Sequence, residues 1–414
     1  MKTLVVVGGG AAGFFCAVNA ARLNRNLRVI LLEKTTKLLA KVKVSGGGRC
    51  NVTHNCPSVS DLCRKYPRGQ HFVKKAFAHF SVPDTIRWFE QRGVELKTEP
   101  DGRMFPVSNS SQTIIDCLLH EAEVYGVEIR TQCEVREIVP VGGGFEIVSS
   151  QNAKLTADFV CVAGGGYPKK ENFGWLGNLG HTIEEPVPSL FTFNMPQNPV
   201  TALMGVAVAR ATAKVASSKL AETAPLLITH WGMSGPAVLR LSAWGARMLH
   251  EKDYAFSALI HWVADASEES VRAEFQKVRF ASPTQKLSNA NPFRLPQRLW
   301  DFLLHKAGIH ADQRWADLPS KEQNRLVKIL TNDEYAVKGK TTFKEEFVTC
   351  GGVKLSEIEP ETMQSRLVPG LFFAGEIMDV DGITGGFNFQ HAWTSGWLAA
   401  RAVAQRCPGF SDGK

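Results

Sequence analysis

A glycine pattern near the N-terminus constrains the fold of this 414-residue chain more than any other feature. Gly8, Gly10 and Gly13 stand in the order G-x-G-x-x-G, after the β-branched run TLVVV and before the alanine-rich stretch AAGFFCAVNAARL. This strand–turn–helix pattern predicts a helix whose N-terminus faces the phosphates of a dinucleotide. A second strand-like run, RVILLE, ends at Glu33, where a carboxylate can accept hydrogen bonds from ribose hydroxyls. The sequence therefore favours a dinucleotide-binding α/β fold over a glycine-rich turn in an unrelated α/β domain.

A second glycine run follows, where a domain that binds only NAD would continue into another helix and strand. The segment VSGGGRCN, residues 44–51, lies in a stretch crowded with cations. These cations are Lys34, Lys37, Lys41, Lys43 and Arg49. Backbone N–H groups and positive charge together suit a diphosphate, so the pattern predicts a second clamp on a longer, bent cofactor. A basic surface loop with flexible glycines is the alternative.

Two further glycine-rich segments favour FAD as that cofactor. The run ADFVCVAGGGYP, residues 157–168, predicts a buried strand that ends in three glycines. Near the other end of the chain, GLFFAGEIMDVDGITGGFNFQHAW predicts a strand, then Glu376, then a helix that begins at Gly385 and Gly386. The N–H groups at that helix start can stabilise negative charge on the pyrimidine ring of a reduced flavin, and Glu376 can reach a ribityl hydroxyl.

With these segments, the chain resembles the bacterial NAD(P)/FAD-dependent oxidoreductase family, which are flavoproteins with a two-dinucleotide-binding fold. The family includes BaiN-like bile-acid reductases, aminoacetone-oxidase-like proteins and flavoproteins linked to dihydrouridine formation in ribosomal RNA. The motifs SGGGRCN and GEIMDVDGITGGFN carry the resemblance most specifically, and THWGMSGPAVLRLS and LGHTIEEPVPSL extend it over nearly the whole chain. The resemblance implies FAD as cofactor, and an α/β, Rossmann-like FAD-binding domain with an inserted mixed β-barrel-like and helical domain.

The motifs and the resemblance together predict which residues contact FAD. They are Gly8, Gly10, Ala11, Ala12, Gly13, Glu33, Lys34, Lys41, Ser45, Gly46, Gly47, Arg49, Cys50, Asn51, Val135, Ala163, Gly164, Gly165, Gly375, Glu376, Gly385, Gly386, Phe387 and Asn388. Among them, Val135 stands where this fold commonly offers its backbone to the adenine. Three departures from the family pattern leave the shape of the pocket, and therefore the substrate, undetermined. PKKENFGWLGNLGH replaces a Thr-Gly-rich turn, Phe387 replaces a tyrosine, and Cys350 replaces a small residue.

The pattern of hydrophobic residues predicts two domains. An FAD-binding domain is expected over 1–190 and 341–414, and an inserted substrate domain over 191–340. Residues 126–165 predict short strands, and the glycines at 142–144 predict a hairpin turn rather than a second nucleotide site. In the inserted part, strand-like runs such as GVAVARATAKV come before three helix-like stretches, SEESVRAEFQKVR, PQRLWDFLLHKAG and PSKEQNRLVKIL.

Two residues are candidates for catalysis. His230 lies in the glycine-rich turn THWGMSGP, where it could face the flavin or simply bond to the backbone. Cys50 follows Arg49, which is expected to lower the pKa of the thiol, although packing near the flavin is the alternative. The chain has no Cys-x-x-Cys pair, which disfavours a disulfide-reductase mechanism. It also has no second complete dinucleotide motif, so NADH or NADPH is expected to bind transiently against the flavin.

Composition restricts the cellular setting. The 48 basic and 40 acidic residues give a formal charge of +8, which fits either a solvated surface or contact with a polyanion such as ribosomal RNA through clusters like RKYPRGQHFVKK and KGKTTFK. Nine cysteines without metal-binding spacing predict reduced thiols in the cytoplasm and no metal site. The apolar N-terminal run belongs to the glycine pattern rather than to a signal peptide. No apolar run reaches the ~18 residues of a membrane helix, so no membrane association is expected.

These observations leave two classes of function. The first is an FAD-dependent oxidoreductase that uses NADH or NADPH to reduce an activated carbon–carbon double bond. Its substrate would be a small molecule or an RNA base, such as a uracil that becomes dihydrouridine in ribosomal RNA. The second is an FAD-binding protein that binds RNA or a partner without catalytic turnover.

Overall fold

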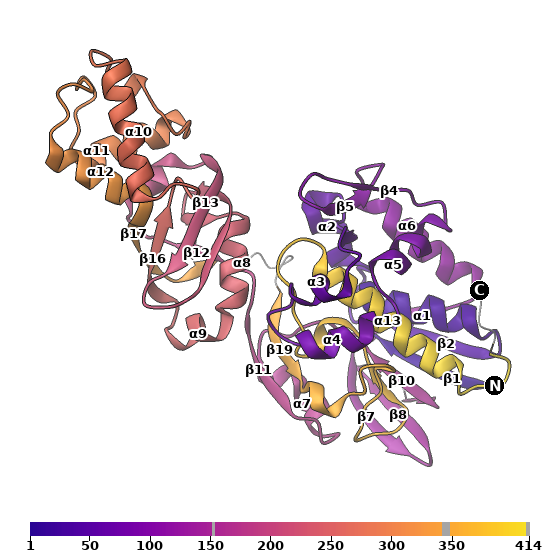
Figure 1. Ribbon diagram of the computed structural model, residues 1–414. Helices are drawn as coiled ribbons and strands as arrows, with labels where there is room; N and C mark the ends of the chain where they lie inside the picture. The colour runs from indigo at the N-terminus through magenta and orange to yellow at the C-terminus, as the bar shows by residue number, and fades with distance from the viewer. Residues whose placement is uncertain (151–153, 342–347, 411–414) are drawn as a thin grey trace. The chain divides into compact units, whose positions relative to one another are not determined.

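The chain forms two compact units, and the second is inserted into the first (Figure 1). The first unit combines residues 1–189 with 343–414, and the second contains residues 190–342. The computed structural model describes residues 1–150, 154–341 and 348–410. Among these described residues, no helix is both long enough and apolar enough to cross a membrane.

A five-stranded parallel sheet forms the centre of the first unit. Its strands, in spatial order, are β20 (Leu371–Phe373), β10 (Phe159–Val162), β1 (Lys2–Val7), β2 (Leu27–Leu32) and β6 (Glu128–Arg130). Leu4 on the central strand lies opposite both Val29 and Phe159. Strands β20, β10, β1 and β2 are almost wholly apolar and buried because a parallel sheet is covered on both faces, whereas the edge strand β6 carries Glu128 and Arg130 and is only half-buried. The Rossmann-like α/β architecture predicted from the glycine pattern is confirmed.

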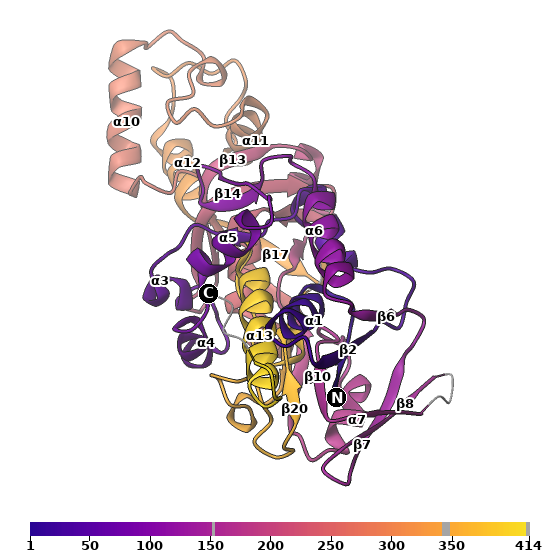
Figure 2. The ribbon, with the colours of Figure 1, turned by 90° about the vertical axis from the view of Figure 1, so that its right-hand side faces the viewer.

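Two long helices, α1 (Ala11–Leu23) and α13 (Phe387–Ala404), pack directly against each other beside this sheet, as Figure 2 shows. A Cβ atom on Gly396 of α13 would lie 2.6 Å from the carbonyl oxygen of Ala12, so glycine at this position permits the close crossing. The other helices of the first unit are α2 (Ala40–Gly48), α3 (Val59–Cys63), α4 (Gln70–Phe77), α5 (Val82–Glu90), α6 (Ser111–Val124) and α7 (Gly174–Gly177). Of these, α6 is about as long as α1, with 14 residues, and the rest are shorter.

Three small antiparallel sheets complete the first unit. Their strands are β7 (Val135–Val141), β8 (Gly144–Ser149) and β9 (Lys154–Ala157); β3 (Thr53–His54), β5 (Arg103–Pro106) and β4 (Leu96–Thr98); and β11 (Ile183–Pro188) with β19 (Thr349–Val353). The predicted hairpin is confirmed, because β7 and β8 pair across a turn in which Gly142 and Gly143 have φ of +55° and +86°. These are left-handed backbone conformations that favour glycine.

The second unit contains a seven-stranded antiparallel sheet. Its spatial order is β17 (Asp333–Lys338), β16 (Ala255–His261), β13 (Ala207–Val215), β14 (Ala221–Thr229), β15 (Gly232–Ser234), β12 (Thr192–Asn194) and β18 (Lys340–Thr341). The two edge strands, β17 and β18, are separated in the chain only by Gly339, and β12 also contacts β17. The sheet therefore curls back on itself, in agreement with the barrel-like expectation.

Five helices accompany that sheet. They are α8 (Pro236–Trp244), α9 (Ala246–Glu251), α10 (Glu268–Ala281), α11 (Gln297–Ala307) and α12 (Ser320–Asn332). The last three confirm the three predicted helical stretches. A core that includes Trp262, Trp300 and Trp315, each fully buried, joins the sheet to these helices. The second unit thus has its own hydrophobic core.

Candidate FAD-binding site

The turn between β1 and α1 explains the first glycine pattern atom by atom. Gly8 has a φ of +115°, and a Cβ atom there would lie 2.4 Å from the carbonyl oxygen of Ala163. A Cβ atom on Gly13 would lie 1.9 Å from the carbonyl oxygen of Gly8. Gly10 differs, because a Cβ atom there would meet nothing within 4 Å. Two of the glycines are therefore needed for packing, while the third leaves open space at the start of α1.

The start of α1 is suited to bind an anion. Ala11 and Ala12 form its first turn, which carries no acidic side chain, and no side chain caps the helix at Gly10. Unpaired N–H groups and the partial positive charge of a helix N-terminus attract phosphate oxygens. The open space at Gly10 and these free donors together fit the pyrophosphate of FAD.

Glu33 lies directly after β2 and beside the glycine turn. Its Oε2 atom accepts a hydrogen bond from the Gly9 N–H at 2.9 Å, and Oε1 accepts one from the Thr35 N–H at 2.8 Å. The carboxylate is thus held at the edge of the turn. This is the position from which an acidic residue contacts an adenosine ribose in such folds.

A pocket of about 500 Å³ adjoins Glu33. Five of the predicted contact residues line it: Gly8, Glu33, Lys34, Val135 and Gly164. The rest of the lining was not predicted from the sequence, and it includes Cys133, Glu134, Arg136, Tyr167, Pro168, Asn172 and Trp175. Four of these seven lie in 167–175, which overlaps the segment PKKENFGWLGNLGH that departs from the family pattern. Tyr167 and Trp175, two aromatic residues that follow the glycines at 164–166, are the feature of the sequence that could have indicated this part of the pocket. The pocket fits the adenosine half of FAD.

The second glycine run ends helix α2 in a loop. Ser45 has a non-helical ψ of 148°, and its carbonyl oxygen accepts a hydrogen bond from the Cys50 N–H at 3.0 Å. The three glycines that follow have φ of +58°, +70° and +84°. A Cβ atom on Gly47 would meet nothing within 4 Å, whereas one on Gly46 would lie 2.8 Å from the Phe105 ring. The loop therefore exposes its backbone on one side and packs on β5 on the other.

Arg49 and Cys50 show what surrounds them in the fold, and their contact with FAD stays a prediction. The Arg49 guanidinium forms an ion pair with Glu99 at 2.6 Å and lies 4.0 Å from the centre of the Phe105 ring. It is therefore already neutralised by a carboxylate. The Cys50 thiol is fully buried, and this burial raises its pKa to about 12. The prediction that Arg49 lowers the pKa of this thiol is wrong, which removes the reason for a redox role of Cys50.

Glu376 lies where three predicted segments meet. Its Oε2 atom accepts a hydrogen bond from Lys41 Nζ at 2.6 Å, and Oε1 accepts one from the Thr349 N–H at 2.8 Å. A Cβ atom on Gly165, in the loop after β10, would lie 4.0 Å from Glu376 Oε2. The preceding residue, Gly375, has a φ of +75°, and a Cβ atom there would lie 2.8 Å from Ala12 of α1. The fold thus brings residues from both ends of the chain to one place, as the prediction requires.

The start of α13 is tied to the SGGGRCN segment. A Cβ atom on Gly386 would lie 2.6 Å from the backbone of Thr53, so glycine is required there. With its amide oxygen facing α13, Asn51 accepts a hydrogen bond from the Gly386 N–H at 2.9 Å. The first turn of α13 carries no acidic side chain. This helix N-terminus therefore remains suited to stabilise negative charge on a flavin ring.

Phe387 and Asn388, at the start of α13, make their contacts within the protein. The Asn388 amide donates to the Gly382 carbonyl oxygen at 2.9 Å and accepts from the Gly382 N–H at 2.8 Å. The Phe387 ring stacks on His54 with a centre-to-centre distance of 4.7 Å, and the Phe387 carbonyl oxygen accepts from the Tyr66 hydroxyl at 2.6 Å. Phe387 and Asn388 therefore shape the loop before α13, and their direct contact with FAD stays a prediction.

The other candidate for catalysis lies in the second unit. His230 is exposed in the turn between β14 and β15, and its ring centre lies 4.2 Å from that of Trp231. A catalytic role for this histidine stays a prediction.

Comparisons with known proteins agree with this geometry. A family model described as the HI0933-like protein Rossmann domain matches residues 2–402. The chain is 33% identical over 409 residues to a ribosomal RNA dihydrouridine synthase of Escherichia coli K12, with 96% of each chain covered. It is 28% identical over 421 residues to a 3-dehydro-bile acid delta(4,6)-reductase of Clostridium scindens, which covers 98% of this chain and 100% of that protein.

Solved structures share the fold at low sequence identity. The 3-ketosteroid delta1-dehydrogenase of Sterolibacterium denitrificans has a TM-score of 0.52 and 12% identity, covering 98% of this chain and 100% of that one. At this level of identity the likeness concerns the arrangement of elements alone.

Proposed function

The chain belongs to the HI0933-like Rossmann family and is an FAD-dependent oxidoreductase, and from this premise we propose that it reduces a carbon–carbon double bond conjugated with a carbonyl group. The names of the two relatives support this reaction class. One describes the formation of dihydrouridine and the other the reduction of delta(4,6) double bonds in a 3-dehydro bile acid. Both reactions add hydrogen to an alkene next to a carbonyl group.

The residues of the first unit would bind and orient the cofactor for this reaction. Bound FAD supplies hydride transfer, and NADH or NADPH is the proposed source of electrons. The N–H groups at the start of α1 would hold the pyrophosphate, and Glu33 the adenosine ribose. Glu376 would hold a ribityl hydroxyl, and the start of α13 would stabilise negative charge on the flavin pyrimidine.

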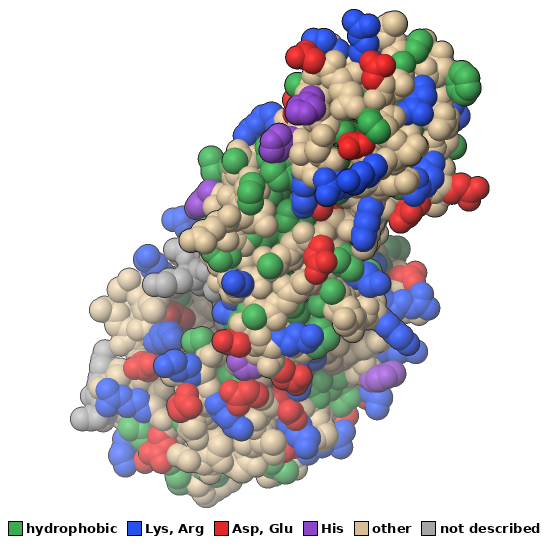
Figure 3. Space-filling model, turned by 90° about the vertical axis from the view of Figure 1, so that its left-hand side faces the viewer, with side chains coloured by type: hydrophobic (Ala, Val, Ile, Leu, Met, Phe, Trp, Pro, Cys, Tyr) green, Lys and Arg blue, Asp and Glu red, His purple; other side chains and the backbone are tan. Residues whose placement is uncertain are grey.

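We propose a uracil base in ribosomal RNA as the substrate. The 33% identical relative carries that activity in its name, and the net charge of +8 suits a polyanion. Net charge alone does not locate a binding surface, because Figure 3 shows Lys and Arg side chains scattered among Asp and Glu side chains on the face drawn. The cluster KGKTTFK extends into residues 342–347, which lie outside the described residues.

The proposal is tested in two steps. Anaerobic addition of NADH or NADPH to the purified holoprotein is expected to bleach the visible absorption of the flavin. Ribosomal RNA from a strain that lacks the gene is expected to lose dihydrouridine at a defined position and to regain it with the wild-type gene. If neither nicotinamide reduces the flavin, the proposed electron source is wrong. If ribosomal RNA is unchanged in the deletion strain, the proposed substrate is wrong, and metabolite profiling of the same strain would then identify a small-molecule alkene.

A basic helix face in the first unit is the proposed RNA contact. In α4, Phe72 and Phe77 are buried, whereas His71, Lys74 and Lys75 are exposed, and the helix contains no acidic residue. The segment just before α4 is fixed to the loop that starts α13, because the Tyr66 hydroxyl donates to the Phe387 carbonyl and the Ile383 N–H to the Lys65 carbonyl. The positive charge of Lys74 and Lys75 would therefore lie near the loop at the start of α13, which is part of the proposed flavin site.

The double variant Lys74→Glu/Lys75→Glu is expected to weaken binding of a ribosomal RNA fragment. It should also lower the slope of log affinity against log salt by about 2, since each lysine neutralises one phosphate. Reduction of the flavin by the nicotinamide should stay at the wild-type rate. The matched control is Lys321→Glu/Lys328→Glu, the same charge change on exposed residues of α12. Equal loss of affinity in both variants would show that general charge, not this face, binds the RNA.

A further inference from the structure

The two strands that flank the second unit pair with each other in the first unit. Strand β11 comes just before Ser189, the last residue of the first unit before the chain enters the second. Strand β19, which begins at Thr349, follows the return of the chain. The pair is antiparallel, with Ile183 opposite Val353. We call β11, Ser189 and β19 the neck.

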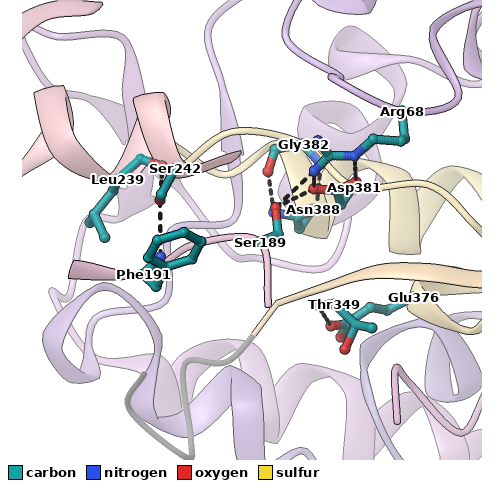
Figure 4. Close-up of polar contacts among 10 residues, drawn as sticks. All are labelled: Arg68, Ser189, Phe191, Leu239, Ser242, Thr349, Glu376, Asp381, Gly382 and Asn388. Carbon is teal, nitrogen blue, oxygen red and sulfur yellow. Dashed lines mark hydrogen bonds and ion pairs between the residues drawn. The ribbon is translucent and has the colours of Figure 1, made fainter. Parts of the chain in front are cut away.

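One segment, residues 375–388, holds both sides of the neck (Figure 4). On the β19 side, the Thr349 N–H donates to Glu376 Oε1 at 2.8 Å. On the β11 side, the Ser189 hydroxyl donates to Asp381 Oδ2. The same segment supplies Glu376 and the start of α13 to the proposed flavin site. The neck and the cofactor therefore contact the same short stretch of chain.

A buried ion pair makes the Ser189 contact rigid. The Asp381 carboxylate is fully buried, and Arg68 Nε donates to its Oδ1 atom at 2.5 Å. Arg68 Nη2 donates both to Asp381 Oδ2 and to the Ser189 hydroxyl oxygen, the latter at 2.9 Å. Each of the three side chains thus contacts the other two. Charged hydrogen bonds in a buried site are strong and fix their partners in place.

The hydrogen-bonded group of Ser189, Arg68 and Asp381 is connected to the start of α13. Asp381 is followed by Gly382, whose backbone makes two hydrogen bonds with the Asn388 side chain. Hydrogen bonds thus link Ser189 through Asp381 and Gly382 to Asn388 in the first turn of α13, the helix start proposed to face the flavin.

We propose that Ser189, Arg68 and Asp381 are positioning residues that couple FAD binding to the order of the neck. FAD binding would fix residues 375–388 and, through them, both sides of the neck. Coupling between two sites is reciprocal, so a weakened neck must also weaken FAD binding by the same factor. The inference rests on the FAD site at residues 375–388 and does not depend on the substrate.

The test compares two serine variants in the full chain. Ser189→Ala removes the hydroxyl that joins the neck to Asp381. The matched control is Ser242→Ala, which removes a buried hydroxyl of the second unit that accepts from the Phe191 N–H at 3.0 Å and donates to the Leu239 carbonyl at 2.8 Å. The Kd for FAD is measured by titration of the apoprotein, and hydrogen exchange of residues 183–189 and 349–353 is measured with and without FAD.

In the wild type, FAD is expected to slow exchange in both neck strands. Ser189→Ala should raise the Kd for FAD about fivefold or more, shift the midpoint potential of the bound flavin and reduce the protection of residues 183–189. Ser242→Ala should leave all three quantities at their wild-type values. A wild-type Kd in Ser189→Ala, or an equal change in both variants, would overturn the coupling. None of the three measurements uses turnover, so failure here is separate from failure of the proposed reaction.

Discussion

Replacing Gly10 by valine is expected to abolish FAD binding while the apoprotein keeps its fold. A Cβ atom at this position meets nothing within 4 Å, and the backbone φ of −92° suits any residue, so the side chain causes no clash within the protein. It would instead fill the open space in front of the α1 N-terminus. Losing two charge-assisted hydrogen bonds to phosphate corresponds to a Kd for FAD raised about 100-fold or more.

Two further glycine variants separate this effect from damage to the fold. Gly10→Ala adds one methyl group to the same space and should weaken FAD binding less than valine does. Gly13→Ala places a Cβ atom 1.9 Å from the Gly8 carbonyl oxygen, so it should lower the melting temperature of the apoprotein. Flavin content, FAD titration and thermal unfolding by circular dichroism give the three readouts. Wild-type FAD affinity in Gly10→Val would mean that the pyrophosphate does not lie at α1.

Local patterns predicted those parts of the fold that depend on local geometry. The turn at Gly8 and Gly13 needs glycine because backbone atoms approach within a side-chain radius, and this requirement shows in the sequence as a fixed spacing. The hairpin at residues 142–144 and the three helices after residue 267 likewise follow from turn chemistry and periodicity. The hairpin, the helices and the contact between Gly13 and Gly8 are each determined by residues within about one element of each other, whereas the close approach of Gly8 to Ala163 joins β1 to the end of β10.

Pairings between distant segments were not predictable in the same way. The sequence places Arg49 among the cations expected to bind a diphosphate. In the fold its guanidinium pairs with Glu99, fifty positions away, because the sheet of β3, β5 and β4 brings the two side chains together. Burial decided the state of Cys50, since its thiol is enclosed and its pKa is raised. The partner of Asp381 is Arg68, which no motif connects to it. In each case the partner or the burial of the side chain is set by a tertiary contact, which neighbouring residues in the sequence do not reveal.

The buried pair of Arg68 and Asp381 carries the largest expected stability change. Arg68→Met should lower the free energy of unfolding by about 3–5 kcal/mol at neutral pH, because it leaves a fully buried carboxylate without its cation. The matched control is Arg28→Met, which breaks an ion pair with Glu128 whose side chains are 44% and 40% exposed. That variant should cost under about 1 kcal/mol, because water solvates both charges. Urea unfolding of the apoproteins measures both.

The cost of Arg68→Met should shrink as the pH falls. Burial raises the pKa of Asp381 above its ordinary value, and the opposing effect of Arg68 is lost in the variant, so that pKa rises further. A carboxyl group whose pKa is raised on folding favours the folded state at low pH and loses this contribution as the pH rises through the folded pKa. Once protonated, the Asp381 carboxyl group is uncharged and needs no cation. The difference in free energy of unfolding between Arg68→Met and the wild type should therefore be largest near pH 7 and smaller in mild acid. The double variant Arg68→Met/Asp381→Asn should recover part of the lost stability at neutral pH. A cost that is the same at both pH values would mean that Arg68 acts through packing rather than through its charge.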